Sequence, residues 1–168
     1  MLQTLNRFTG TALVLVLTAT TATAQIPCVD GNAGGYPCQN IDLMGYLSSD
    51  EVGGGDMNDI WGWIDPSDGT EYAILGRSTG TSFIDISDPA NPVMVANLPT
   101  NTVTSFWRDI KVYDNHAFIV SEASGHGMQV VDLTQLGGIE NPPEDIEADA
   151  LYTGWGNAHN IVINESTA

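Results

Sequence analysis

The sequence has few basic residues. Its 168 residues include four Lys and Arg against 21 Asp and Glu, a formal net charge of −17. Nucleic-acid binding relies on Lys and Arg contacts to phosphates, and anionic membranes attract basic segments. This composition therefore argues against both kinds of partner. It leaves two explanations for the acidity, namely carboxylate clusters that hold divalent cations or general solubility.

Long apolar runs are also missing. The run at residues 12–17 is far shorter than the ~20 residues that span a bilayer. It follows Arg7 and precedes small residues that end at Ala24, which is the layout of a secretory signal peptide cleaved after Ala24. A membrane anchor is the alternative. We expect export, with no membrane-spanning segment after signal cleavage.

Cysteine is rare too, with Cys28 and Cys38 as the only two, in the stretch "CVDGNAGGYPC". No paired CxxC motif and no nearby His are present, which argues against zinc. In an exported chain the Gly-rich spacer allows the two to pair. We predict a disulfide that contributes roughly 2–3 kcal/mol.

Helical patterning is weak, and short runs rich in Val, Ile, Phe and Tyr alternate with turn residues. Strands are predicted at residues 59–64, 71–76, 81–87 and 93–99, and again at 109–113, 116–121 and 128–134. The second set repeats the first. Asp59 and Asp109 lie 50 residues apart, Asn160 follows 51 residues later, and "GTSFIDIS" at Gly80 aligns with "GMQVVDLT" at Gly127.

A period near 50 residues with four strands per unit is typical of β-propeller blades, whereas a β-sandwich does not repeat at this spacing. The predicted fold class is all-β, with two full blades of four antiparallel strands and the start of a third in an incomplete ring. The expected organisation is a signal peptide (1–24), a disulfide-stapled segment and linker (25–57), blade 1 (58–107), blade 2 (108–157) and the start of blade 3 (158–168).

Propellers close with about four to eight blades. We therefore expect the sequence to be a fragment that lacks its C-terminal blades. Assembly of several short chains into one ring is the alternative.

The stretches "GTSFIDISDPANPV", "WRDIKVYDNHAFIVSEASGHGMQVVDLTQL", "AHNIVINE" and "PCVDGNAGGYPCQNIDL" resemble the choice-of-anchor B family. Members are secreted or surface-attached bacterial proteins built from LVIVD-type propeller repeats. The resemblance covers nearly all of residues 25–168. It implies an exported propeller with further blades and a C-terminal surface anchor, and it transfers no catalytic residues.

Polar residues recur just before each innermost strand, where side chains of successive blades converge on the mouth of the central channel. A site for calcium or another divalent cation, or for acid–base chemistry, would consist of Asp59, Asp109, Glu122, His126 and His159. The alternative is structural, with Asp capping turns and His satisfying local hydrogen bonds. The stretch "DPSDGTE" at residues 65–71 is read as a hairpin turn rather than a calcium loop.

The sequence has four tryptophans, Trp61, Trp63, Trp107 and Trp155. They allow either a carbohydrate-stacking platform or burial between blades, and burial is the favoured prediction.

The predicted function is a secreted or cell-surface binding or adhesion scaffold for an extracellular protein or carbohydrate, without catalytic residues. The alternative is a calcium-dependent, lactonase-like propeller hydrolase with its site at the channel mouth.

Overall fold

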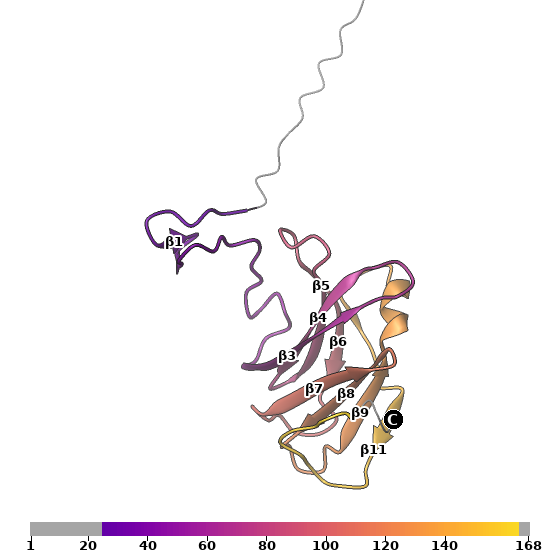
Figure 1. The fold of residues 1–168 in the computed structure, drawn as a ribbon. Coiled ribbons are helices and arrows are strands. Elements are labelled where there is room, and N and C mark those ends of the chain that lie inside the picture. The colour runs from indigo at the N-terminus through magenta and orange to yellow at the C-terminus, as the bar shows by residue number, and fades with distance from the viewer. Residues whose placement is uncertain (1–24, 165–168) are drawn as a thin grey trace, which may run out of the picture.

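The computed structural model describes residues 25–164. The predicted signal peptide and residues 165–168 lie outside this range. Two mainly antiparallel sheets face each other, and a small N-terminal segment projects away from them (Figure 1). The fold is all-β and propeller-like, with no closed barrel in the described part, as the repeat pattern predicted.

The first sheet forms where the first set of strands was expected. Its strands are β3 (Met57–Ile64), β4 (Glu71–Arg77), β5 (Gly80–Asp85) and β6 (Val93–Pro99), each antiparallel to the next. Alternate residues are buried along β4 and β6, which is the period-two pattern of a strand with one covered face.

The second sheet repeats this order with β7 (Arg108–Tyr113), β8 (His116–Ser121), β9 (Met128–Asp132) and β11 (Ala150–Tyr152). The two-residue turn between β7 and β8 consists of Asp114 and Asn115, both with positive φ. Asp and Asn adopt this conformation readily, and two such residues suit a tight hairpin. This tight turn is why the first hairpin of the second repeat is shorter than that of the first repeat, which uses residues 65–70.

Two elements between β9 and β11 were not predicted. A 3₁₀ helix, η1 (Leu133–Gly138), follows β9, and the Asp132 side chain caps it by accepting from the Thr134 N–H. The chain then returns as β10 (Glu144–Asp145), which pairs in parallel with β6 of the first sheet. The first sheet therefore has five strands, and the connection within the second repeat ties the two sheets together.

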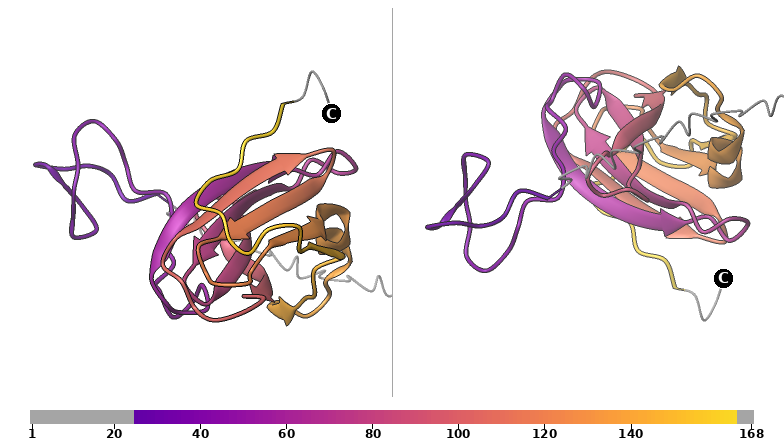
Figure 2. Two further views of the ribbon diagram at one scale, coloured as in Figure 1. Left: turned by 90° about the horizontal axis from the view of Figure 1, so that it is seen from below. Right: turned by 90° about the horizontal axis from the view of Figure 1, so that it is seen from above.

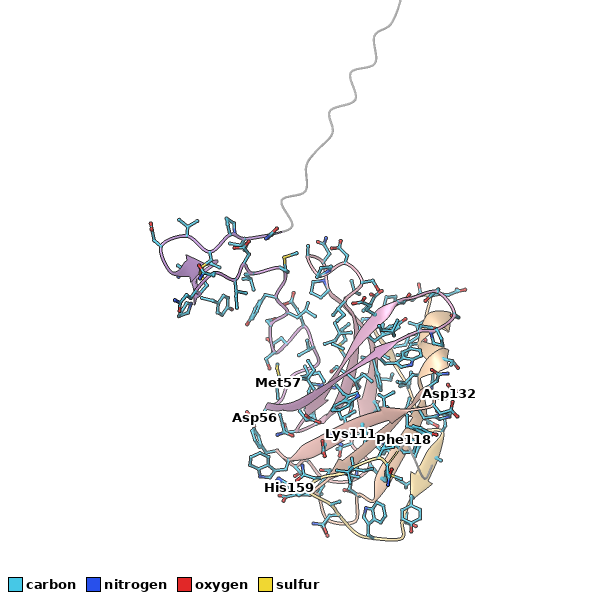
Figure 3. All side chains as sticks on the ribbon, viewed as in Figure 1. Asp56, Met57, Lys111, Phe118, Asp132 and His159 are labelled. Carbon is cyan, nitrogen blue, oxygen red and sulfur yellow. A yellow bond between two sulfur atoms is a disulfide. The ribbon has the colours of Figure 1, made fainter. Side chains whose placement is uncertain are left out.

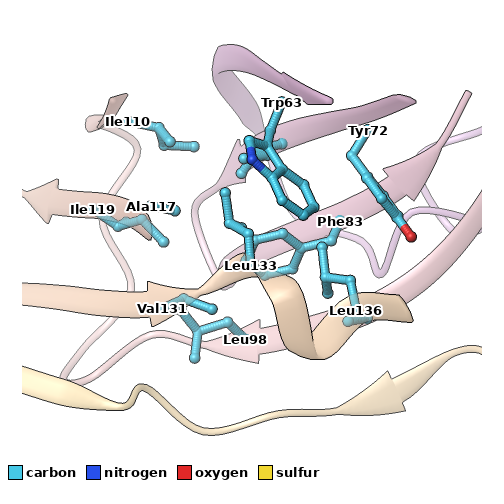
Figure 4. Close-up of a cluster of buried hydrophobic side chains, with 12 residues drawn as sticks. Trp63, Tyr72, Phe83, Leu98, Ile110, Ala117, Ile119, Val131, Leu133 and Leu136 are labelled. Atoms are coloured by element: carbon cyan, nitrogen blue, oxygen red, sulfur yellow. The ribbon is translucent and has the colours of Figure 1, made fainter. Parts of the chain in front are cut away.

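The main core lies between the two sheets (Figure 4). Phe83 and Ile74 of the first sheet and Ile119 of the second are fully buried. Leu133 and Leu136 of η1 close the cluster at one end. Full burial stabilises the fold by about 1.5–3 kcal/mol for each large apolar side chain, so this interface is the main source of stability.

The N-terminal segment carries a two-residue hairpin, β1 (Asn32–Ala33) and β2 (Tyr36–Pro37), and the predicted disulfide joins Cys28 to Cys38. This part lies to one side of the sheets in both views of Figure 2. Residues 44–56 contain no helix or strand, and turns and bends occupy residues 49–55.

Gly80 and Gly127, aligned in the repeat, share one structural role. A Cβ at Gly80 would lie 2.3 Å from the Leu98 carbonyl oxygen, and one at Gly127 would lie 2.3 Å from that of Tyr152. In both sheets the fourth strand approaches the start of the third so closely that only glycine fits.

Candidate functional site

All five candidate residues lie at one end of the two sheets. Because β3 and β7 run in the same sense, the turns at residues 78–79, 100–107, 122–127 and 153–160 all fall at the end where these strands begin. We call it the loop end. Figure 3 places His159 there, at the opposite end of the second sheet from Asp132.

Asp59 and Asp109 occupy equivalent positions and make equivalent contacts. The Asp59 Oδ2 accepts the Ile110 backbone N–H at 2.8 Å, and the Asp109 Oδ2 accepts the Ile161 N–H at 2.7 Å. Each carboxylate thus binds the backbone of the next repeat, 51 and 52 residues ahead. These interblade hydrogen bonds give the recurring Asp a structural role.

Residues 159–164 contain no strand, although the repeat pattern predicted one there. The Ile161 N–H nevertheless makes the contact to Asp109 that Ile110 makes to Asp59.

The two carboxyl groups also interact with each other, and their pKa values move in opposite directions. Burial raises the pKa of Asp59, and the hydrogen bond shared with Asp109 raises it further, against the opposing Ile110 N–H. Burial also acts to raise the pKa of Asp109, but the hydrogen bonds from Lys111 and the Ile161 N–H leave it below its ordinary value. Asp109 is therefore the more acidic member of the pair.

Lys111 completes this cluster. Its ammonium group donates to the Asp109 Oδ1 at 2.5 Å and to the Ile110 carbonyl at 2.8 Å, and it lies 4.4 Å from the centre of the Trp61 ring. Both Asp109 oxygens are thus occupied. Calcium takes six to eight oxygen ligands, and residues 25–164 contain no group of three or more His, Cys, Asp and Glu side chains placed to hold a metal.

His126 is separated from the other candidates because its turn points it inward. It is fully buried, its Nε2 lies 3.0 Å from Arg108 Nη1, and its Nδ1 lies 3.1 Å from the Gly127 carbonyl. The guanidinium can only donate, so Nε2 accepts and Nδ1 carries the proton. Burial and the Arg108 charge lower the His126 pKa, so the ring is neutral in the fold.

Two buried arginines at the loop end were not identified from the sequence. Arg108 donates to the Arg77 carbonyl and the Thr100 hydroxyl as well as to His126. Burial, with a smaller effect of the Arg77 charge, lowers the Arg108 pKa to about 10. Arg77 donates to the carbonyls of Gly53 and Gly54. Neither guanidinium has a carboxylate partner among the described residues.

Glu122 and His159 form an exposed pair. His159 Nδ1 lies 2.7 Å from Glu122 Oε1, and both side chains are largely in solvent. The Trp107 ring lies 5.4 Å from His159, and Phe106 packs edge-on against Trp107 at 4.7 Å. We call these four side chains the loop-end cluster. The five candidates therefore occupy three places, namely the Asp pair, buried His126 and this cluster.

The prediction of tryptophan burial is correct only for Trp63, which is 7% exposed and stacks on Tyr72 in the core. Trp61, Trp107 and Trp155 are 41%, 45% and 41% exposed. Their positions lie at the inner strand and on the loops, outside the area that the facing sheets cover.

Comparison with known proteins identifies an LVIVD repeat at residues 72–100, which spans β4, β5 and β6. No curated protein and no solved structure matches the chain. An LVIVD repeat is typical of extracellular repeat proteins of the β-propeller type, and the two stacked sheets, of five and four strands, agree with this class. The disulfide is compatible with an extracellular location. No helix within residues 25–164 is long and apolar enough to cross a membrane.

Proposed function

We propose that this chain belongs to a secreted or cell-surface binding scaffold of the choice-of-anchor B kind, which binds its partner through the loop end. The observation that carries the proposal is that the polar residues fall into two groups with different surroundings. The carboxylates on the inner strands hold the next repeat, while the half-exposed aromatic and ionisable side chains gather on the loops. Loops on a rigid β scaffold are the usual place for a binding surface.

The proposal includes further blades. The outer face of the second sheet carries Tyr113, Phe118 and Met128 around a hollow of about 410 Å³, bordered by residues 161–163. The equivalent side of the first repeat is where the facing sheets pack. An apolar sheet face of this kind is what the next blade of a ring covers.

Saturable binding of the purified, labelled protein to a panel of bacterial cells and extracellular polymers tests the scaffold. We expect saturable binding that is weakened by Trp107→Ala and unchanged by a calcium chelator. Absence of saturable binding to every surface would refute the proposal.

The calcium-dependent hydrolase has less support, because one oxygen of Asp59 and both oxygens of Asp109 already accept from backbone N–H groups or Lys111. Metal analysis together with thermal unfolding separates the two functions. A scaffold retains no stoichiometric calcium and has the same Tm with and without chelator. Stoichiometric calcium and a Tm that falls on chelation would favour the hydrolase.

A further inference from the structure

The loop-end cluster combines ring surfaces with a hydrogen-bonding pair. Phe106 and Trp107 are 44% and 45% exposed, and their rings are almost perpendicular, at 87°. Beside them, the Glu122 carboxylate and the His159 imidazole have side chains that are 40% and 53% exposed. Two large half-exposed rings next to two polar groups form a surface with both an apolar and a polar part.

The cluster lies on the loops rather than on a sheet face. Glu122 and His159 belong to the turns at 122–127 and 153–160, and Trp107 ends the connection from the first sheet to the second. Stacking of a further blade covers a sheet face, so it does not account for the exposure of Phe106, Trp107 and Glu122, which lie on loops of the two described repeats.

The charge of the surroundings restricts the ligand. Among the described residues the Lys and Arg side chains are Arg77 and Arg108, each 2% exposed, and Lys111, which is held by Asp109. No exposed guanidinium or free ammonium in this part of the chain can meet a sulfate, phosphate or carboxylate of a ligand. With a net charge of −17, the molecule repels anions at longer range as well.

We propose that the loop-end cluster binds an uncharged pyranose glycan. The apolar face of a sugar ring packs on Trp107 and Phe106, and neighbouring hydroxyls bond to the Glu122 carboxylate and the His159 ring. Hydroxyls both donate and accept, which suits a carboxylate and an imidazole that are already hydrogen-bonded to each other at 2.7 Å. A basic peptide would have to compete with His159 for the carboxylate. This inference rests on the proposed scaffold function and specifies its ligand class.

Affinity electrophoresis tests the proposal, with gels that contain a soluble β-glucan, dextran, xylan or glycol chitin, alongside dextran sulfate and polylysine. The variant is Trp107→Ala. Its fold should persist, because the Trp107 backbone carbonyl, which accepts from Ser121 Oγ and the Glu122 N–H, remains in the alanine variant. Trp155→Ala is the matched control, since Trp155 is 41% exposed and packs on Tyr152 outside the cluster. Thermal unfolding confirms that both variants are folded.

We expect at least one neutral polysaccharide to retard the wild type. Trp107→Ala should weaken retardation at least tenfold, Glu122→Gln should weaken it severalfold, and Trp155→Ala should leave it unchanged. Absence of retardation by all neutral polysaccharides, retardation by polylysine alone, or equal losses in the two Trp variants would overturn the glycan proposal. If cells are still bound in a Trp107-dependent way, only the ligand class is wrong; if neither cells nor polymers bind, the scaffold function fails too.

Discussion

The interblade carboxyl pair should respond unequally to the same chemical change. Asp59→Asn and Asp109→Asn each replace one carboxylate oxygen by an amide NH₂. Asp59 uses one oxygen to accept the Ile110 N–H, and its carboxyl group shares a hydrogen bond with Asp109. An asparagine there keeps an acceptor for Ile110 and can donate to Asp109, so we expect a stability change within about 0.5 kcal/mol.

Asp109 uses both of its oxygens as acceptors. Oδ1 takes Lys111 and Oδ2 takes the Ile161 N–H and the Asn160 amide. An amide has one acceptor oxygen and no charge, so Asp109→Asn must leave one set of donors unpaired. We expect a loss of about 2 kcal/mol in the free energy of unfolding. Asp59→Ala removes the nearer acceptor of the Ile110 N–H and leaves it only the Asp109 Oδ1, at 3.1 Å, so it should cost about 1 kcal/mol.

The pH dependence provides a second readout. The raised pKa of Asp59 favours the fold below its ordinary pKa of 3.8, and this contribution is lost as the pH rises through the folded-state value. Asp59→Asn cannot ionise, so its stability relative to wild type should improve as the pH rises from 3.8 through the folded-state pKa of Asp59. The lowered pKa of Asp109 acts in the opposite sense, with stability present above 3.8 and lost as the pH falls.

Urea unfolding followed by tryptophan fluorescence measures these differences, with Trp63 as the buried reporter in the core. The reasoning fails if Asp59→Asn is as costly as Asp59→Ala, or if Asp109→Asn is as mild as Asp59→Asn.

Four further predictions concern other parts of the fold. Gly127→Ala, at φ +68° with its new Cβ against a carbonyl oxygen, should cost about 3 kcal/mol in urea unfolding, and a loss below 1 kcal/mol would contradict the close approach. Arg108→Met should also cost about 3 kcal/mol, because it removes three buried hydrogen bonds. The lowered pKa of His126 gives stability that is present above its ordinary 6.5 and lost as the pH falls, so in thermal unfolding scans His126→Gln should flatten the drop between pH 7 and pH 5. Reduction of Cys28–Cys38 should leave the main unfolding transition of the sheets within about 1 kcal/mol of its original position, and a larger shift would show that the N-terminal segment supports the blades.

The strands could be predicted because local pattern determines them. Apolar alternation and turn residues located β3 to β9, and the 50-residue spacing of Asp59 and Asp109 identified equivalent inner-strand positions. The disulfide followed from having two cysteines in an exported chain. These features depend on composition and short-range order, which the sequence contains directly.

Features that depend on contacts distant in sequence were not predicted. Strand β10 is two acidic residues long and has no alternation, and it forms only because β6 offers an edge. His126 turns inward because Gly125 and Gly127 both adopt positive φ, a geometry that spacing does not specify. The exposure of Trp107 depends on which surfaces the facing sheets cover, and hydrophobicity alone predicted the opposite.

Amide hydrogen exchange at two residues tests the central claim most directly, namely that each inner-strand Asp holds the backbone of the next repeat. We expect Asp59→Ala to accelerate exchange at Ile110 while Ile161 stays as in the wild type, and Asp109→Ala to accelerate exchange at Ile161. Unchanged protection at Ile110 in Asp59→Ala and at Ile161 in Asp109→Ala would show that these carboxylates do not join the repeats, and would contradict the account.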